Sequence, residues 1–198
     1  MRKYLLVLMV LALAWQFNGI GAAAITADAR QKIDISGHPV KGPGNAGVTV
    51  IVFSDYLCPA CRRLEPILHQ VLEKYPKDVR LVHKLCTHHD FSRKAVAAAY
   101  AALDQNRFWE FHDRLFEYQL GMNKAMVISI AKELHLDLKR FNKKMKDPAI
   151  QKLIDRDMED VSRLSIPGTP TVYVNGIVLE DRSLQGFQAA IERELNRK

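Results

Sequence analysis

The pattern of apolar and polar positions predicts a strand, a helix and a second strand near the start of the folded chain. Residues 48–53 are an unbroken β-branched and apolar run after Gly47, which is typical of a central strand buried on both faces. Apolar side chains then recur at helical spacing over 59–74, where Pro66 predicts a kink. Residues 79–85 have a strand pattern. This order predicts a βαβ unit with parallel strands and a right-handed crossover.

Helical periodicity dominates the middle of the chain. We expect helices there over about 95–103, 108–119, 124–134, 138–145 and 150–164. They would form a helical insertion at about 90–165, after which the sheet resumes at 171–174. Asn175-Gly176 is a strong hairpin signal before a strand at 177–179, and an amphipathic helix ends the chain. The expected fold class is therefore α/β.

The first residues have the composition of a secretory signal. Arg2 and Lys3 precede an apolar run, and small residues at 21–24 resemble a cleavage site. We expect a signal peptide over 1–24, a polar arm over 25–46 that can hold one short edge strand, and the folded domain over 47–198. The alternative is an uncleaved membrane anchor, because the N-terminal apolar stretch is long enough to span a bilayer. In both cases the expected location is periplasmic or otherwise extracytoplasmic.

Composition and charge narrow the classes of function. The 198 residues fit one domain with a sizeable core. The formal net charge is +7, but the basic residues are scattered among acidic ones, so we expect a solvated surface and no nucleic-acid partner. Three cysteines cannot all pair within the chain, which excludes a framework stapled by disulfides.

Two of these cysteines, Cys58 and Cys61, form a C-x-x-C motif where the first strand meets the helix. A cysteine is a nucleophile only as the thiolate. Pro59 suits the first helical position, which puts Cys58 at the N-cap, where the helix dipole and the free N–H groups of the first turn stabilise a negative sulfur. Cys61 follows one turn later on the same face, near enough to attack a mixed disulfide at Cys58. We therefore assign Cys58 as the nucleophile and Cys61 as the resolving cysteine.

The same spacing also occurs in metal sites. Zinc could be held by the two cysteines with one of the downstream histidines, which are His83, His88 and His89. However, no second C-x-x-C and no H-x₃₋₅-H motif follows, and a C-x-x-C in a βαβ unit is typical of redox sites. We favour redox chemistry and expect no metal ligand and no cofactor. A metal-binding or metal-delivery module, or a chaperone that binds exposed strands without turnover, is the alternative.

These motifs together resemble the thioredoxin superfamily, and within it the DsbA-like exported thiol–disulfide oxidoreductases. The resemblance covers about 47–198 and rests on Cys58-Pro59-Ala60-Cys61, on Phe-Trp-Glu-Phe-His-Asp at 108–113 and on Ile-Pro-Gly-Thr-Pro-Thr at 166–171. It implies a thioredoxin-like fold in which Pro170 is a cis-proline facing the cysteine pair. It also implies that Thr169 binds a substrate segment through backbone hydrogen bonds.

Three further positions bear on the chemistry. Asp55 follows the first strand and is a candidate proton relay to Cys61, although strand-end carboxylates are more often turn or capping residues. The strong oxidants of the family carry histidine where this chain has Ala60, which cannot stabilise the thiolate by charge or by a side-chain hydrogen bond. We expect Cys86 to act as a small buried apolar residue; a third redox thiol or an intermolecular link is the alternative.

The resemblance implies an oxidase that introduces disulfides into exported proteins with free thiols through a redox-active Cys58–Cys61 disulfide. A membrane quinone-linked partner would reoxidise it. An isomerase or reductase of the same fold is the nearest alternative, with a partner that reduces it. The family's isomerases carry a longer N-terminal dimerisation domain than residues 25–46, which argues against an isomerase. We also expect a monomer.

Overall fold

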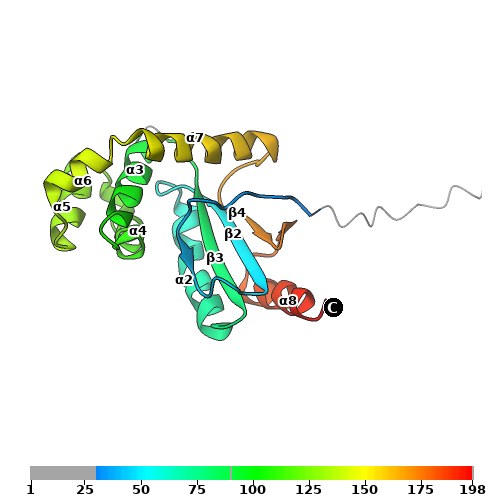
Figure 1. Ribbon diagram of the computed structural model, residues 1–198. Helices are drawn as coiled ribbons and strands as arrows, with labels where there is room; N and C mark the ends of the chain where they lie inside the picture. The colour runs from blue at the N-terminus through cyan, green and yellow to red at the C-terminus, as the bar shows by residue number, and fades with distance from the viewer. Residues whose placement is uncertain (1–29, 90, 198) are drawn as a thin grey trace, which may run out of the picture.

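A five-stranded sheet forms the centre of the computed structural model, which describes residues 30–89 and 91–197 (Figure 1). The expected signal peptide, 1–24, lies outside the described residues. In chain order the strands are β1 (Val40–Lys41), β2 (Val48–Ser54), β3 (Val79–Leu85), β4 (Thr171–Val174) and β5 (Ile177–Val178). Their order in the sheet is β1-β3-β2-β4-β5, with β2 parallel to β3 and antiparallel to β4. The predicted central strand and parallel pair are confirmed.

Strand β2 serves two hydrophobic cores, because successive side chains of a strand point to opposite faces. Val50 and Val52 pack in one core with side chains of α2 (Pro59–Lys74) and α8 (Leu184–Leu195). On the other face, Phe53 packs in a separate cluster with residues of α7 (Pro148–Arg163). Helices therefore cover both faces of the sheet, which explains why β2 has no alternation of apolar and polar residues.

A group of helices lies beside the sheet, between β3 and β4 in sequence (Figure 1). Before α7 it contains α3 (Ser92–Leu103), α4 (Phe108–Glu117), the short 3₁₀ helix η1 (Gln119–Gly121), α5 (Lys124–Glu133) and α6 (Leu138–Lys144). The alanine-rich α3 is buried over most of its length and shares a core with residues of α4, α5 and α6. Helix α7 runs from this group back over the sheet. The expected helical insertion is present.

Some boundaries differ from the expected ones. Helix α3 begins at Ser92 rather than Ala95, because Ser92 is a buried polar residue that apolar periodicity does not mark. Helix α4 ends at Glu117, and the chain continues through η1 rather than as one helix to Gln119. Helix α2 continues through Pro66, and the kink there stays a prediction.

The expected hairpin between β4 and β5 is confirmed. Asn175 and Gly176 have φ angles of 47° and 83°, the left-handed conformations that a tight two-residue hairpin requires. The Asn175 side chain accepts a hydrogen bond of 2.8 Å from the backbone N–H of Thr49. A side chain at 176 would meet the carbonyl oxygen of Gln31 at 2.5 Å, so the turn and the N-terminal arm both require glycine there.

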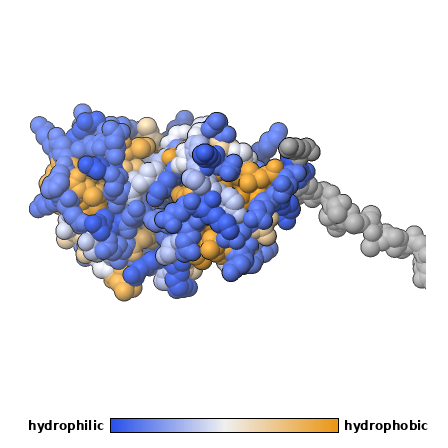
Figure 2. Space-filling model, turned by 90° about the horizontal axis from the view of Figure 1, so that it is seen from below, coloured by the Kyte–Doolittle hydropathy of each residue, from blue (hydrophilic) through white to orange (hydrophobic). Residues whose placement is uncertain are grey.

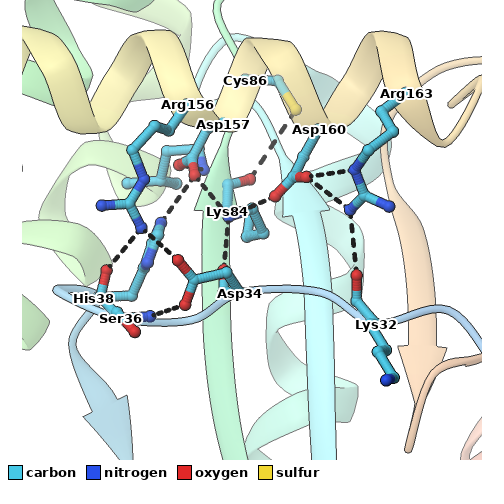
Figure 3. A network of polar contacts seen from close by, with 11 residues as sticks. Lys32, Asp34, Ser36, His38, Lys84, Cys86, Arg156, Asp157, Asp160 and Arg163 are labelled. Carbon is cyan, nitrogen blue, oxygen red and sulfur yellow. Dashed lines mark hydrogen bonds and ion pairs between the residues drawn. The ribbon is translucent and has the colours of Figure 1, made fainter.

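The N-terminal arm is bound to the sheet by β1, the predicted edge strand, and by a buried polar network (Figure 3). The ammonium group of Lys84, on β3, lies 2.9 Å from Asp157 and 3.0 Å from Asp160, both on α7. It also donates to the backbone carbonyl of Asp34 in the arm, and the His38 ring lies 2.7 Å from Asp157. One buried cation thus joins the arm, the sheet and α7.

The surface agrees with the solvated exterior expected from the scattered charges. The face in Figure 2 is largely hydrophilic, and hydrophobic residues gather there in separate patches. Within 30–89 and 91–197, none of the helices has the length and apolar character needed to cross a membrane.

Candidate active site

Cys58 lies at the N-cap of α2, as predicted, in an extended conformation with Pro59 at the start of the helix. Cys58 is 9% exposed, whereas Cys61 is 1% exposed in the first turn. Both are free thiols. Both cysteines are thus buried, and Cys58 is the more accessible of the two.

The surroundings of Cys58 favour its thiolate. Burial acts against ionisation, but hydrogen bonds from the Thr169 side chain and from the backbone N–H and thiol of Cys61 outweigh it, so the pKa of Cys58 is lowered. The N–H of Ala60 acts in the same direction. The protonated Cys58 thiol donates to the backbone carbonyl of Thr169 at a sulfur–oxygen distance of 3.2 Å. The lowered pKa increases the fraction of Cys58 present as thiolate, which is the nucleophilic form of cysteine.

The surroundings of Cys61 have the opposite effect. Burial raises the pKa of Cys61 to about 12, although the Ser54 hydroxyl and the Asp55 backbone N–H favour its thiolate. Cys58 can thus ionise while Cys61 keeps its proton. This difference matches the separate roles that the sequence assigns to the two sulfurs.

The loop before β4 brings Thr169 and Pro170 against Cys58, from more than a hundred residues away in sequence. The Thr169–Pro170 peptide bond is cis, as the resemblance implies. Arg182 donates to the Pro170 carbonyl, and the Thr171 hydroxyl donates to the Gly168 carbonyl at 2.7 Å. These bonds hold both ends of the loop beside the nucleophile.

Asp55 is buried, and its carboxylate is occupied by hydrogen bonds that organise the turn. It accepts from the backbone N–H groups of Leu57 at 2.8 Å and His88 at 3.0 Å, and from the Ser92 hydroxyl at 2.6 Å. The ring of His89 lies 3.0 Å away. These contacts agree with the structural turn role that is the commoner one for a carboxylate at a strand end. A proton relay from Asp55 to Cys61 stays a prediction.

Gln119 and Tyr56 support the cysteine loop, and this role was not predicted from sequence for either residue. The Gln119 amide donates to the backbone carbonyls of Tyr56 at 2.7 Å and Cys58 at 3.0 Å. The Tyr56 hydroxyl lies 2.9 Å from a ring nitrogen of His112. A lone glutamine at a helix end gives no sequence signal for such a role. The next residue, Leu120, is 89% exposed and adds an apolar side chain beside this loop.

Cys86 is separate from this pair. It is fully buried, and burial raises the pKa of its thiol. It packs with Phe53, Val161 and Tyr173, and its weak contact to the Lys84 carbonyl is 3.8 Å long. This environment agrees with the expected small apolar role.

The predicted metal alternative, in which Cys58 and Cys61 bind zinc with a histidine, finds no support. Among the residues that the structure describes, one group of three potential ligands comes together, formed by Glu65, His83 and His112. It contains neither cysteine. Burial lowers the pKa of both histidines to about 3 and raises the pKa of Glu65.

Comparison with known proteins adds the following relationships. Residues 35–193 match the family model described as Thioredoxin. A crystal structure of a thioredoxin-like oxidoreductase from Silicibacter pomeroyi DSS-3 is 30% identical, with a TM-score of 0.74, and the match covers 81% of this chain and 94% of that one. Disulfide bond formation protein D of Bacillus subtilis (strain 168) is 28% identical, over 83% of this chain and 80% of that protein.

A further relative is much longer than this chain. Na(+)/H(+) antiporter NhaA 3 of Salinispora tropica is 35% identical over 160 residues, which are 79% of this chain. The match covers 24% of the antiporter, so the chain spans about a quarter of that protein's length.

Proposed function

Because this chain belongs to the thioredoxin family, as its motifs imply, we propose that it is a thiol–disulfide oxidoreductase, and specifically a DsbA-like oxidase. It introduces disulfides into exported proteins through Cys58 and Cys61. The observation that supports this most strongly is the unequal pair of thiols. Cys58 is the more accessible of the two and has a lowered pKa, while Cys61 is more deeply buried and has a raised pKa.

The proposed reaction transfers two electrons from the substrate to the enzyme. A substrate thiolate attacks Cys58 in the Cys58–Cys61 disulfide; that bond breaks, and Cys61 leaves and takes up a proton. A second substrate thiolate then attacks the substrate sulfur of the mixed disulfide and releases Cys58 as a thiolate. The substrate gains a disulfide and the enzyme becomes a dithiol. The lowered pKa of Cys58 makes it the better leaving group in the second step.

The surroundings of Cys58 support binding of an extended polypeptide. The backbone carbonyl of Thr169, before Pro170, lies 3.2 Å from the Cys58 sulfur, so a substrate strand that pairs with the Thr169 backbone would lie beside this sulfur. Leu120 follows Gln119, which contacts the cysteine loop, and it offers an exposed apolar side chain. Substrates are therefore proteins with free thiols in extended segments.

The cysteine pair itself carries the two electrons, so the reaction needs no cofactor. Reoxidation then requires an external acceptor, and a membrane quinone-linked partner is the proposed one. We place the protein outside the cytoplasm on the basis of the signal-like pattern at 1–24, and we propose separately that it is a monomer. Fusion of 1–24 to a reporter enzyme that is active only after export tests the location; a reporter retained in the cytoplasm would contradict it.

The decisive experiment measures redox potential and substrate oxidation together. The purified protein is equilibrated in glutathione buffers, and the oxidised form is mixed with a reduced, unfolded disulfide protein. We expect a potential clearly above the value of about −270 mV known for thioredoxin, with stoichiometric oxidation of the substrate. A potential near that of thioredoxin together with an unshifted Cys58 thiol would favour a reductase.

Cys86 offers a matched control for this experiment. Cys58→Ser and Cys61→Ser should abolish turnover, since each removes one half of the disulfide. Cys86→Ala, which changes a buried cysteine outside the pair, should keep it. Loss of turnover in Cys86→Ala at an unchanged melting temperature would show that the third thiol takes part.

A further inference from the structure

Three ligand-type side chains from three different elements meet in the interior of the protein. Glu65 comes from α2, His83 from β3 and His112 from α4, and one ligand atom of each lies within 4.8 Å of the others. Glu65 Oε2 is 3.4 Å from His112 Nε2 and 3.9 Å from His83 Nε2. The side chains of the two histidines are 1% exposed or less.

The polar atoms of this group are poorly satisfied. Within the described residues, neither ring nitrogen of His83 has a hydrogen-bond partner, and neither does Oε1 of Glu65. Buried polar atoms in native proteins nearly always have partners, so unpaired ones call for an explanation. The His83 and His112 rings also pack against each other, with a centroid distance of 4.5 Å. Neutral imidazole is the commonest metal ligand in proteins, so a bound ion would provide the missing partners.

We propose that Glu65, His83 and His112 bind a divalent transition-metal ion, for which zinc is the best match. Two imidazoles and one carboxylate are a common zinc donor set that leaves a fourth position open. With bond lengths of about 2.0–2.1 Å, tetrahedral zinc holds its ligand atoms about 3.3 Å apart. The ligand atoms lie within 4.8 Å of one another, so the longest separation has to shorten by up to about 1.5 Å when the ion binds. This site was not predicted from sequence, and it goes beyond the proposed redox function, which requires no metal.

Neighbouring groups are arranged as an outer shell for such an ion. Tyr56 lies 2.9 Å from Nδ1 of His112, which leaves Nε2 turned toward Glu65. Bonds of this kind fix ring orientation in metal sites. The Trp109 ring packs edge-on against both histidines, with centroid distances of 6.0 and 5.4 Å. The Glu65 side chain, 11% exposed, offers an entry from the surface.

An ion at this position would connect the parts of the molecule. It would link the sheet, through His83, to the helical insertion, through His112. Its third ligand, Glu65, lies one helical turn beyond Cys61 on α2. Metal binding should therefore stabilise the whole fold rather than one element.

The test uses the full chain with Cys58→Ser and Cys61→Ser, so that the cysteine thiols cannot bind zinc. This parent is loaded with zinc, dialysed against metal-free buffer and assayed for bound metal by mass spectrometry. We expect about one zinc ion per chain to remain and the melting temperature to rise with added zinc. Absence of both effects overturns the proposal.

Matched variants in the same background test which residues bind. His83→Phe fills the same space with an apolar ring and removes the unpaired nitrogens, so it should fold. Its affinity for zinc should be lower than that of the parent by more than about tenfold. Glu65→Gln, which keeps the shape of the side chain, should also bind more weakly. His135→Asn changes an exposed histidine outside the group and should bind like the parent. Equal zinc retention by the parent and a folded His83→Phe overturns the proposal.

Cobalt gives an independent readout of the ligands. In the parent carrying Trp15→Phe, Trp109 is the remaining tryptophan. Cobalt should quench its fluorescence and give the visible absorption of a tetrahedral ion, and both signals should be lost in His83→Phe. Quenching that is equal in the parent and in His83→Phe overturns the assignment.

Discussion

Cys58 and Cys61, one turn apart at the start of α2, have pKa values shifted in opposite directions. Cys58 stands at the N-cap, where N–H groups of the first turn and Thr169 surround its sulfur, so its pKa is lowered despite burial. Cys61 points into the protein, where burial raises its pKa to about 12. The difference comes from their positions at the helix start, and it supports the proposed roles of Cys58 as nucleophile and Cys61 as resolving cysteine.

The first prediction concerns alkylation of the reduced protein by iodoacetamide. Because only the thiolate reacts, Cys58 should be modified rapidly below about pH 8.5, the ordinary pKa of a free thiol. In Cys58→Ser, modification should be slow up to about pH 9, since Cys61 and Cys86 are buried with raised pKa values. Mass spectrometry of each cysteine gives the rates. A midpoint for Cys58 at or above the ordinary value would contradict the prediction.

The second prediction concerns Ala60, which stands where strong oxidants of the family carry histidine. Ala60→His should lower the pKa of Cys58 further, because the imidazole can donate a hydrogen bond or a positive charge to the thiolate. One pKa unit is about 1.4 kcal/mol, so the redox potential should rise by about 30 mV for each unit by which the pKa of Cys58 falls. Glutathione equilibration measures this. Ala60→Phe adds a ring without a donor and should leave the potential near that of the wild type.

At the scale of elements, the buried network around Lys84 joins segments that are distant in sequence (Figure 3). Lys84 is fully buried and contacts Asp157 and Asp160 on α7 and the carbonyl of Asp34 in the arm. Asp157 also accepts from the backbone N–H of Leu85 at 2.8 Å. Lys84 and Asp157 depend on each other for charge compensation, because both side chains are almost completely buried.

The third prediction is that Lys84→Met strongly destabilises the protein. It leaves Asp157 as a buried carboxylate without its cation, which typically costs about 3–5 kcal/mol in free energy of unfolding. Arg156→Met is the matched control, since the Arg156–Asp34 pair is exposed and should contribute at most about 1 kcal/mol. Urea denaturation of both variants provides the comparison. Equal losses would contradict a buried, interdependent network.

At the scale of the whole molecule, the redox site is part of the folded core. Strand β2 leads directly to the cysteine loop and packs in both sheet cores, while α2 carries the two sulfurs. If folding changes the pKa of a cysteine, the free energy of unfolding of the domain must therefore depend on pH.

The fourth prediction follows for the reduced protein. Folding lowers the pKa of Cys58, so its contribution to stability is present above the unfolded value of about 8.5 and is lost as pH falls through the folded value. Folding raises the pKa of Cys61, so its contribution is lost as pH rises from about 8.5 toward 12. Denaturation at several pH values, compared with Cys58→Ser and Cys61→Ser, should separate these opposite slopes. Parallel pH profiles for all three proteins would contradict both.

Local sequence was sufficient to predict most elements and the position of Cys58 at the start of α2. Strand β2 could be predicted because a short, unbroken β-branched and apolar run is typical of a strand buried on both faces. Cys58 could be placed at the N-cap because Pro59 favours the first helical position. The hairpin at Asn175-Gly176 follows from the need for left-handed backbone at both residues. These features depend on neighbours within one or two turns of chain, which the sequence displays directly.

Tertiary structure alone decided which distant side chains meet. The support of Cys58 by Gln119, the contacts of Asp55 with three distant residues and the meeting of Glu65, His83 and His112 join separate parts of the chain. No spacing marks them, because their proximity depends on how α4 and the loop after β3 pack against the sheet. By itself, the sequence determined the cysteine pair and the elements that carry it. Packing decided the burial that separates the two thiols and the internal group of ligands beneath them.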